Sequence, residues 1–483
     1  MSNTDIIKKI IGLQDVIITN IQENSESIEI FMQLEVKDHE CPCCHSITKK
    51  IHDYRVQRVT DVPYFNKKVI FVLRKRRYVC RHCGKRFAEK NTFLPKYHQM
   101  TNRLVAYIIS RLQNTLPFTQ IAKEVGVSVS TVIRVFDLLS YGKPKLPNVL
   151  SIDEFKGNTG QEKYQVILTD PVNHIVLDIL PKRTKYELTD YFKKYPREER
   201  LKVEYFVSDM YKPYRELSET WFRNATVIAD KYHWTRQVVW SFENVRKRIQ
   251  KQFSKQYRIY FKNSRKLLIK HYGELTEEQK IQVSVMLSVS ADLSTAYYLK
   301  EELYKILNAK SQAQAKKLLA QWIQEAEESE IPEFKPAITA FRNWFTQIIN
   351  SISQPITNGF TEGCNNKIKV LKRNAYGYKN FERFRKRILF MFSEAAKRNN
   401  AVKGKLALDC ISIFIVFGQP QLLTKSPKNS VKRMLCRVFI IINLFLYKKH
   451  LTLFSSASPR RDKRRRGTCF QAFRPHRLSF RRR

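Results

Sequence analysis

The stretch Val149-Leu-Ser-Ile-Asp-Glu-Phe155 decides the fold of the largest region of this 483-residue chain. Its apolar residues predict a β-strand over 148–152 that is followed at once by Asp153. A second apolar strand, predicted over 203–207, leads in the same way to Asp209. Two strands that each deliver an aspartate at the end indicate a shared carboxylate site, provided that the strands are neighbours.

The segments around these two strands complete an order of elements typical of ribonuclease H-like folds, which is three strands, a helix, a strand, a helix and a strand. In that order the first and fourth strands are neighbours, so Asp153 and Asp209 are expected side by side. The other elements are expected at 164–168 (strand), 174–180 (strand), 184–195 (helix), 211–222 (helix) and 226–229 (strand).

A third acid, Glu362, opens a helix after a long helical region. Residues 234–355 are rich in Lys, Gln, Glu and Leu and contain no convincing strand, which predicts an all-helical insertion. Three carboxylates can hold two divalent metal ions that clamp the attacking and leaving oxygens of a phosphodiester. Carboxylates have no reason to gather in a basic chain unless they hold cations.

The helix that begins at Glu362 carries amides and cations on the same face, because spacings of 3, 4, 7 and 11 return to one side of a helix. Asn365 and Asn366 are expected to support the metal ligands, and Lys369 and Arg373 to contact DNA phosphates. The alternative is an ordinary solvated basic face.

Other acidic residues compete with these three for a role in the site. Glu154 is expected on the opposite face of its strand, and Asp170 sits in an apparent turn. Asp178 also lies near the end of a predicted strand. Asp230 ends the last strand with His233 nearby, so both are expected to support the metal ligands or to position the substrate.

The charge of the chain favours a polyanionic partner. There are 88 Lys and Arg against 44 Asp and Glu, a formal net charge of +44. Residues 401–483 hold 20 basic and 2 acidic residues, so the rest of the chain still carries +26. Nucleic acid is the usual partner of such a protein, and a ribosomal-type or membrane-surface protein is the alternative.

No export signal is expected, because Lys8 and Lys9 interrupt the apolar residues near the start of the chain. The apolar run at 434–447 is too short to span a membrane. A cytoplasmic protein is therefore expected. In that compartment nine cysteines favour metal ligands or free thiols over disulfides.

Two cysteine pairs predict a zinc site, namely Cys41-Pro-Cys-Cys44 and Cys80-Arg-His-Cys83. Four thiolates form the closed tetrahedral site of structural zinc, and Gly84 permits the tight turn of a zinc knuckle. Cys43 and His82 are alternative ligands, and buried free thiols are the alternative to a metal site. The expected ligands are Cys41, Cys44, Cys80 and Cys83.

Basic residues crowd the second cysteine pair, and next to a zinc ribbon they indicate contacts with DNA phosphates. A solvated basic face is the alternative. The expected contacts from this region are Arg76, Arg77, Arg81 and Lys85.

Residues 118–136 (FTQIAKEVGVSVSTVIRVF) have the pattern of a helix-turn-helix. Gly126 makes the turn and Ser128 caps the second helix, whose Ser130, Thr131 and Arg134 are expected to face the major groove. The alternative is a helical hairpin that binds nothing.

The stretch NGFTEGCNNKIKVLKRNAYGYKNF at 358–381 resembles the glutamate segment of bacterial insertion-sequence transposases of the ISL3 family. SIDEF at 151–155, VSDMYKPY at 207–214 and ADKYH at 229–233 resemble other blocks of that family, and the resemblance covers about residues 35–397. It implies a bacterial, nucleoid-associated cut-and-join enzyme with a ribonuclease H-like core. The resemblance implies that Asp153, Asp209 and Glu362, which match the family's catalytic positions, are the catalytic residues.

The expected architecture is multidomain α+β, with a zinc ribbon, a helix-turn-helix and a ribonuclease H-like α/β core that carries an all-helical insertion. The tail is expected to be either a basic arm or a read-through extension. The expected segments are 1–37 (N-terminal strands), 38–98 (zinc ribbon), 99–143 (helix-turn-helix), 148–233 (core, first part), 234–355 (insertion), 356–400 (core, glutamate helix) and 401–483 (tail).

The expected function is that of a DNA transposase with two Mg²⁺ or Mn²⁺ ions at the acids and one structural Zn²⁺. Its expected partners are the terminal inverted repeats, target DNA and a second copy of the chain, with no membrane. One alternative is a DNA-binding regulator without enzymatic activity, and the other is a nuclease that cuts without joining.

Overall fold

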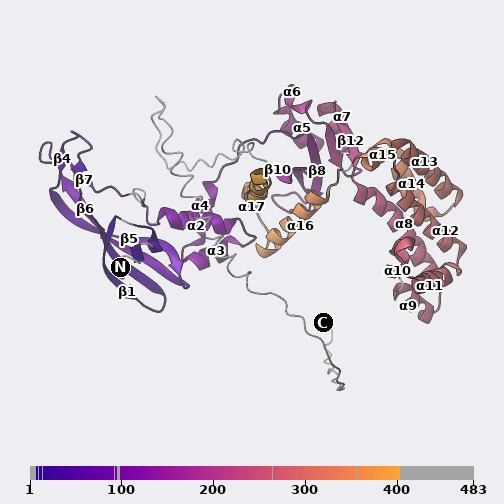
Figure 1. Ribbon diagram of the computed structural model, residues 1–483, viewed down its shortest axis with the longest axis horizontal. Helices are drawn as coiled ribbons and strands as arrows, with labels where there is room; N and C mark the ends of the chain where they lie inside the picture. Colours follow the sequence, from indigo (N-terminus) through magenta and orange to yellow (C-terminus); the bar gives the residue numbers. More distant parts are fainter. Residues whose placement is uncertain are drawn as a thin grey trace, which may run out of the picture. The chain divides into compact units, whose positions relative to one another are not determined.

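The structure is a computed structural model that describes residues 7–402 except 9, 14, 92, 95–97, 264 and 355 (Figure 1). Side chains at 260, 262, 263 and 394–402 are not described. The predicted tail at 401–483 therefore lies outside the described residues, apart from the backbone of its first two. None of the helices described combines the length and apolarity needed to cross a membrane.

The N-terminal strands and the cysteine-bearing module share one five-stranded sheet of order β1-β2-β6-β5, in which β7 pairs with β6. The sheet contains strands from both sides of the domain boundary expected at residue 37. In particular, β2 pairs in parallel with β6, with Ile28 opposite Val69. The strands are β1 (Val16–Glu23), β2 (Ser27–Leu34), β5 (Ile51–Tyr64), β6 (Lys67–Val79) and β7 (Arg86–Ala88), and a separate small hairpin joins β3 (His39–Glu40) to β4 (Ile47–Thr48).

Three short helices follow and form the predicted helix-turn-helix. They are α2 (Asn102–Leu112), α3 (Phe118–Val125) and α4 (Val129–Asp137). Gly126 adopts φ 68° at the end of α3, a conformation that glycine reaches without steric cost. The Ser128 side chain accepts a hydrogen bond from the Thr131 N–H and so caps α4. Ile121, Val125 and Val132 are buried in the shared core.

A second five-stranded sheet has the order β10-β9-β8-β11-β12, which confirms the predicted ribonuclease H-like arrangement. β8, β11 and β12 are parallel, and β9 runs antiparallel to both β8 and β10. β8 does not end before Asp153, because Asp153 still pairs with Ile167 of β9. The strands are β8 (Val149–Phe155), β9 (Gln165–Asp170), β10 (Ile175–Leu180), β11 (Tyr205–Ser208) and β12 (Thr226–Ala229).

Alternation along β8 sends its side chains to two different cores. Leu150 and Ile152 join the apolar cluster that includes residues of α5 (Lys185–Lys193) and α7 (Lys212–Trp221). Phe155 joins the cluster on the other face, which includes residues of α16 (Gly359–Asn374) and α17 (Phe381–Val402). Ser151 and Asp153 have the same parity as Phe155, so they face the side of α16. The short α6 (Arg197–Arg200) lies between α5 and β11 in the chain.

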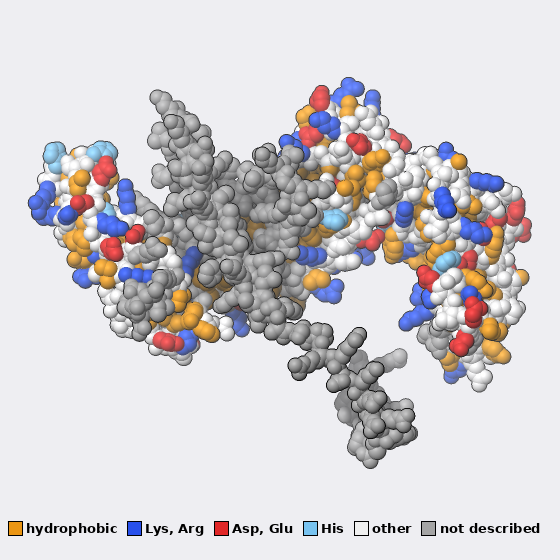
Figure 2. All heavy atoms as spheres, in the orientation of Figure 1, with side chains coloured by type: hydrophobic (Ala, Val, Ile, Leu, Met, Phe, Trp, Pro, Cys, Tyr) orange, Lys and Arg blue, Asp and Glu red, His pale blue; other side chains and the backbone are white. Residues whose placement is uncertain are grey.

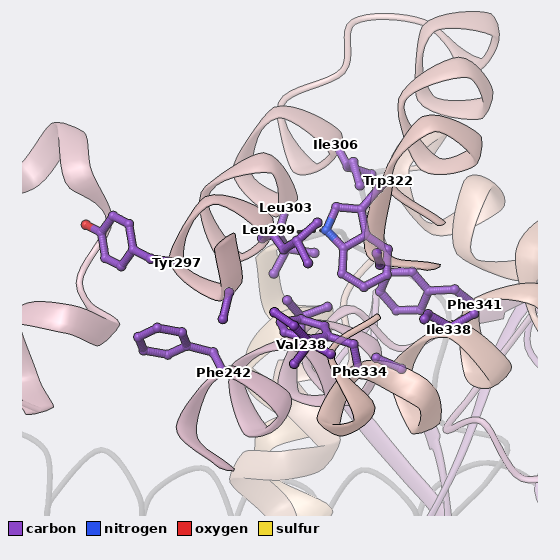
Figure 3. Packing of buried hydrophobic residues seen from close by; sticks show 14 of the residues in the cluster. Val238, Phe242, Tyr297, Leu299, Leu303, Ile306, Trp322, Phe334, Ile338 and Phe341 are labelled. Carbon is purple, nitrogen blue, oxygen red and sulfur yellow. Dashed lines mark hydrogen bonds between the residues drawn. The ribbon is translucent and has the colours of Figure 1, made fainter. Parts of the chain in front are cut away.

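The described residues from 231 to 353 form helices joined by turns and contain no strand, as predicted for the insertion. Its core contains Val238 and Phe242 of α8 beside Trp322, Phe334 and Phe341 from the later helices (Figure 3). The elements are α8 (Lys231–Lys251), α9 (Lys255–Asn263), α10 (Arg265–Ile269), η1 (Tyr272–Glu274), α11 (Glu277–Leu287), α12 (Ala291–Leu307), α13 (Gln312–Glu328), η2 (Pro332–Phe334), α14 (Lys335–Asn343) and α15 (Phe345–Ser353).

Helix α17 is anchored by Arg387, a fully buried arginine. Its guanidinium donates hydrogen bonds to the backbone carbonyls of Leu112, Asn114 (2.9 Å) and Leu116 (2.6 Å). These carbonyls lie at the end of α2 and in the loop before α3. A buried charge is tolerated here because three acceptors compensate its lost hydration.

Candidate active site

The sheet places three aspartates at matching positions on neighbouring parallel strands. Val207 of β11 is the register partner of Ser151 of β8, and each is followed two residues later by an aspartate, Asp209 or Asp153. Ser208 is in turn the partner of Ala229 of β12, so Asp230 follows at the position next to Asp209. The three carboxylates therefore form a row across the ends of β8, β11 and β12.

Helix α16 brings Glu362 to this row through buried hydroxyl contacts. The Ser151 hydroxyl donates to Oδ1 of Asn358 at 2.6 Å, just before the helix begins. The Thr361 hydroxyl lies 2.7 Å from that of Thr169 on β9. All four of these residues are buried. Glu362 follows directly, so the strand hydroxyls determine where its carboxylate enters the site.

The closest group around Glu362 contains Asp230 and His233, whose ligand atoms all lie within 4.8 Å of one another and of a Glu362 oxygen. Asp230 caps the N-terminus of α8 and His233 follows one turn later. Asp153 and Asp209 are outside this tight group in the described structure. The sequence predicted only a supporting place for Asp230 and His233, although their i, i+3 spacing at a strand-to-helix junction was the available signal.

Asp153 is held by hydrogen bonds on both carboxylate oxygens. Asn365 of α16 donates from Nδ2 to Oδ2 at 2.8 Å, and the Glu154 N–H donates to Oδ1 at 2.7 Å. Asn365 is buried, whereas Asn366 is exposed and accepts a hydrogen bond from Lys369 at 3.3 Å. Of the two amides, only Asn365 therefore reaches an acid of the site.

The acids share a poorly solvated, negatively charged environment. Burial, followed by repulsion from neighbouring acids, raises the pKa of Asp153 to about 7. The same causes raise the pKa of Asp209 to about 7. Burial also raises the pKa of Asp230 and of Glu362. Among the described residues, Oδ1 of Asp209 and Oδ2 of Asp230 are buried without any hydrogen-bond partner, so this donor set fits divalent cations.

The competing acids are committed to other contacts. Glu154 points to the opposite face, where it accepts hydrogen bonds from Arg183 (2.8 Å) and Tyr214 (2.9 Å). Asp170 accepts from the backbone N–H groups after it and forms the predicted turn. Asp178 is paired with Arg385 at 2.6 Å.

The four predicted zinc ligands lie together, with ligand sulfurs all within 4.8 Å of one another. Cys41 and Cys83 are 3.5 Å apart, as are Cys44 and Cys80. Hydrogen bonding with Ser46 lowers the pKa of Cys44 to about 5, which favours the thiolate that binds metal. Cys43 and His82 are exposed and outside the group.

Gly84 has φ 71°, and its N–H donates to the Cys80 carbonyl at 3.0 Å, which closes the predicted tight turn. The four sulfurs therefore fit one tetrahedral metal ion without rearrangement of the backbone.

The structure corrects the expectation for Arg76. Its side chain is 3% exposed, pairs with Glu89 at 3.2 Å and donates to the Leu34 carbonyl at 2.9 Å. These contacts make it an internal support of the sheet. Arg77 is half-buried against Asp53, at 3.0 Å.

The remaining predicted DNA contacts are accessible. Ser130 and Arg134 are exposed on α4, and Thr131 is half-buried. The other predicted basic contacts are also exposed, namely Arg81, Lys85, Lys369 and Arg373. Lys and Arg side chains also appear on each of the described regions visible in Figure 2.

Three family models match the chain. The model described as "Transposase", of the DDE class of family ISL3, matches residues 150–388. The "Helix-turn-helix domain of transposase family ISL3" matches residues 89–139. The "zinc-finger of transposase IS204/IS1001/IS1096/IS1165" matches residues 37–83.

Two curated transposases are similar to the chain, and so is a short segment of a third protein. The chain is 26% identical over 372 residues to the transposase for insertion sequence element IS1001 of Bordetella parapertussis, covering 75% of this chain and 91% of the relative. It is 29% identical over 118 residues to the transposase for IS1557 of Mycobacterium tuberculosis, covering 24% of this chain and 26% of the relative. A 66-residue match, 41% identical, is to a Lactococcus lactis protein named ATP-dependent protease and covers 14% of this chain and 21% of that protein.

Proposed function

The chain belongs to the ISL3 family of insertion-sequence transposases, and on that premise we propose that Asp153, Asp209 and Glu362 are its catalytic acids. It is a DDE-type transposase with a zinc ribbon and a helix-turn-helix. The expectation of a regulator without enzymatic activity is set aside, because the DDE transposase model matches residues 150–388.

One observation carries the proposal for the acids. Asp153 and Asp209 each follow two residues after the register partners Ser151 and Val207, and the contacts of Ser151 and Thr169 hold the end of α16 that carries Glu362. A position set by strand register is precise, because backbone hydrogen bonds determine it.

The chain's residues hold and orient the acids of the site. Asn365 fixes the direction of the Asp153 carboxylate, and the burial of Asp153 and half-burial of Asp209 limit their contact with water. Two Mg²⁺ or Mn²⁺ ions, when bound, would polarise the scissile phosphate and activate water or a 3′ hydroxyl as the nucleophile. Lys369 and Arg373 extend from the same helix and are proposed to contact the phosphates that flank the cut.

The N-terminal modules are proposed to recognise the terminal inverted repeats of the element. Ser130, Thr131 and Arg134 enter the major groove, while Arg77, Arg81 and Lys85 contact phosphates. One Zn²⁺ ion holds the ribbon together through its four cysteines. Because two element ends must be joined to target DNA, a dimer or larger assembly is proposed to work in the bacterial cytoplasm, at the nucleoid.

The experiment uses labelled duplex DNA that carries the ends of the element encoding this chain. We expect Mg²⁺-dependent cleavage and, from pre-cut ends, joining to a target plasmid. Glu362→Gln should lose both reactions and retain DNA binding. Cleavage without any joined product would instead identify a simple nuclease, and full activity of the variant would refute the assignment of Glu362.

A further inference from the structure

We propose that Asp230 and His233 bind one of the catalytic metal ions directly, together with Glu362, so that this ion has a nitrogen ligand as well as oxygen ligands. This inference rests on the proposed function, because it concerns the same metal site. It adds two residues to the acid triad and gives a histidine the place of a ligand.

The geometry is close to what one ion requires. An ion with metal–ligand bonds of about 2.1 Å separates opposite ligands by about 4.2 Å. The ligand atoms of Asp230, His233 and Glu362 already lie within 4.8 Å of one another. Rotation of these side chains that shortens the separations brings all three ligand atoms onto one ion.

A second observation points to a missing partner at this place. Asp230 is 5% exposed, and its Oδ2 makes no short hydrogen bond in the described structure, although the Asn358 side chain also lies near this carboxylate. This oxygen lies 3.7 Å from Nε2 of His233, which is too long for a hydrogen bond. A buried carboxylate oxygen without a partner is costly, and a shared cation compensates both it and the facing imidazole nitrogen.

The local sequence explains why these two groups face the same point. In Ala229-Asp-Lys-Tyr-His233 the aspartate caps α8, using Oδ1 to accept from the Tyr232 N–H at 3.4 Å. Oδ2 takes no part in this cap, and the i+3 histidine returns to the same side of the helix one turn later. The strand β12 ends at Ala229, directly before Asp230. The side chains of Asp230 and His233 are therefore at the β12 end of the row of aspartates.

The ligand set has a chemical consequence. Asp153 and Asp209 offer oxygen alone, which suits Mg²⁺, whereas an imidazole nitrogen strengthens binding of Mn²⁺ relative to Mg²⁺. The two ion positions therefore differ, and the position at Glu362 is the one with the greater preference for Mn²⁺.

Pulsed electron paramagnetic resonance of bound Mn²⁺ tests this directly, because a coordinated imidazole couples to the metal through nitrogen. We expect nitrogen modulation in the wild-type full chain and its loss in His233→Gln. The matched control is His174→Asn, because His174 is exposed and stacks on Phe360 of α16 at 5.0 Å but is outside the group. We also expect Asp230→Asn to weaken Mn²⁺ binding by at least about tenfold in titration calorimetry.

Isotope labelling of the wild-type protein gives a second test that does not depend on whether a variant folds. Growth with ¹⁵N-histidine should change the modulation from the ¹⁴N to the ¹⁵N pattern, with every residue in place. Absence of nitrogen coupling in the wild type, or its persistence in a folded His233→Gln, would overturn the inference.

The inference and the proposed function can fail separately. If Asp153→Asn and Glu362→Gln abolish cleavage while Mn²⁺ shows no nitrogen coupling, the triad stands and the histidine ligand is refuted. If nitrogen coupling is present but both variants still cleave, the metal site stands and the assignment of the catalytic acids is refuted.

Discussion

Ser151 and Val207 are register partners in the parallel pair β8–β11, and two residues later each strand delivers an aspartate. This pairing sets the separation of Asp153 and Asp209 by backbone hydrogen bonds. Substitutions that keep the shape of these side chains are therefore expected to change the chemistry of the site and to leave the sheet intact.

Asp209→Asn is expected to reduce DNA cleavage by about 10³-fold or more, because the loss of a charged ligand weakens electrostatic stabilisation of the transition state. Binding to end DNA should be unchanged in a gel-shift assay. Asp190→Asn is the matched control, because Asp190 is half-exposed on α5 and pairs with Lys194 at the surface. Equal activity of both variants would contradict the assignment of Asp209.

Cys44→Ser is expected to release zinc and to lower the melting temperature of the N-terminal region, because three thiolates hold the ion less tightly than four. Cys43→Ser, one residue away but outside the sulfur group, should keep its metal. Zinc analysis after dialysis measures both. Zinc loss from Cys43→Ser at the level of Cys44→Ser would point to a different ligand set.

The stability of the Mg²⁺-free protein is expected to fall as pH rises from about 4 to about 7. Burial raises the pKa of Asp153 and of Asp209 to about 7 in the folded chain, against about 3.9 when unfolded. The stabilisation from the protonated acids is thus complete below pH 4 and lost as pH passes 7, by at most about 4 kcal/mol for each acid.

Melting temperatures at pH 5 and pH 8 measure this effect. Asp209→Asn removes one titrating group, so its melting temperature should depend less on pH than that of the wild type. Identical pH dependence in the two proteins would show that these acids do not govern it.

Arg134→Ala is expected to weaken binding to end DNA by about 1–3 kcal/mol at fixed salt, and to weaken binding to an unrelated duplex much less, because a base contact carries sequence discrimination. Lys316→Ala, on the exposed face of α13, is the control of equal charge change. An equal loss on both duplexes would assign Arg134 to a phosphate instead.

Arg387→Leu is expected to destabilise the protein by about 3–5 kcal/mol, because the carbonyls of Leu112, Asn114 and Leu116 lose their shared donor. Arg383→Ala on the same helix should cost no more than about 1 kcal/mol, since its pair with Asp137 is exposed. Urea unfolding compares the two, and similar midpoints would show that Arg387 does not anchor α17.

Patterns local to the chain predicted much of this fold. The strand at 226–229 agrees with β12, and the Gly126 turn with its Ser128 cap is found where periodicity and capping chemistry placed it. The long strand β5 was not predicted, because residues 51–64 mix charged and apolar side chains without a clean alternation. Its antiparallel pairing with β6 stabilises an extended conformation that its own sequence pattern does not indicate.

The sequence by itself determined most of the helices and strands around the site, the two strands that lead to Asp153 and Asp209, and the cysteines that are spaced for zinc, because these depend on near neighbours in the chain. Only the tertiary structure decided that β2 joins β6, that Arg76 is buried against Glu89, and that Asp230 and His233 lie beside Glu362. Such contacts join residues that are distant in sequence, and packing and burial select them after the local elements exist.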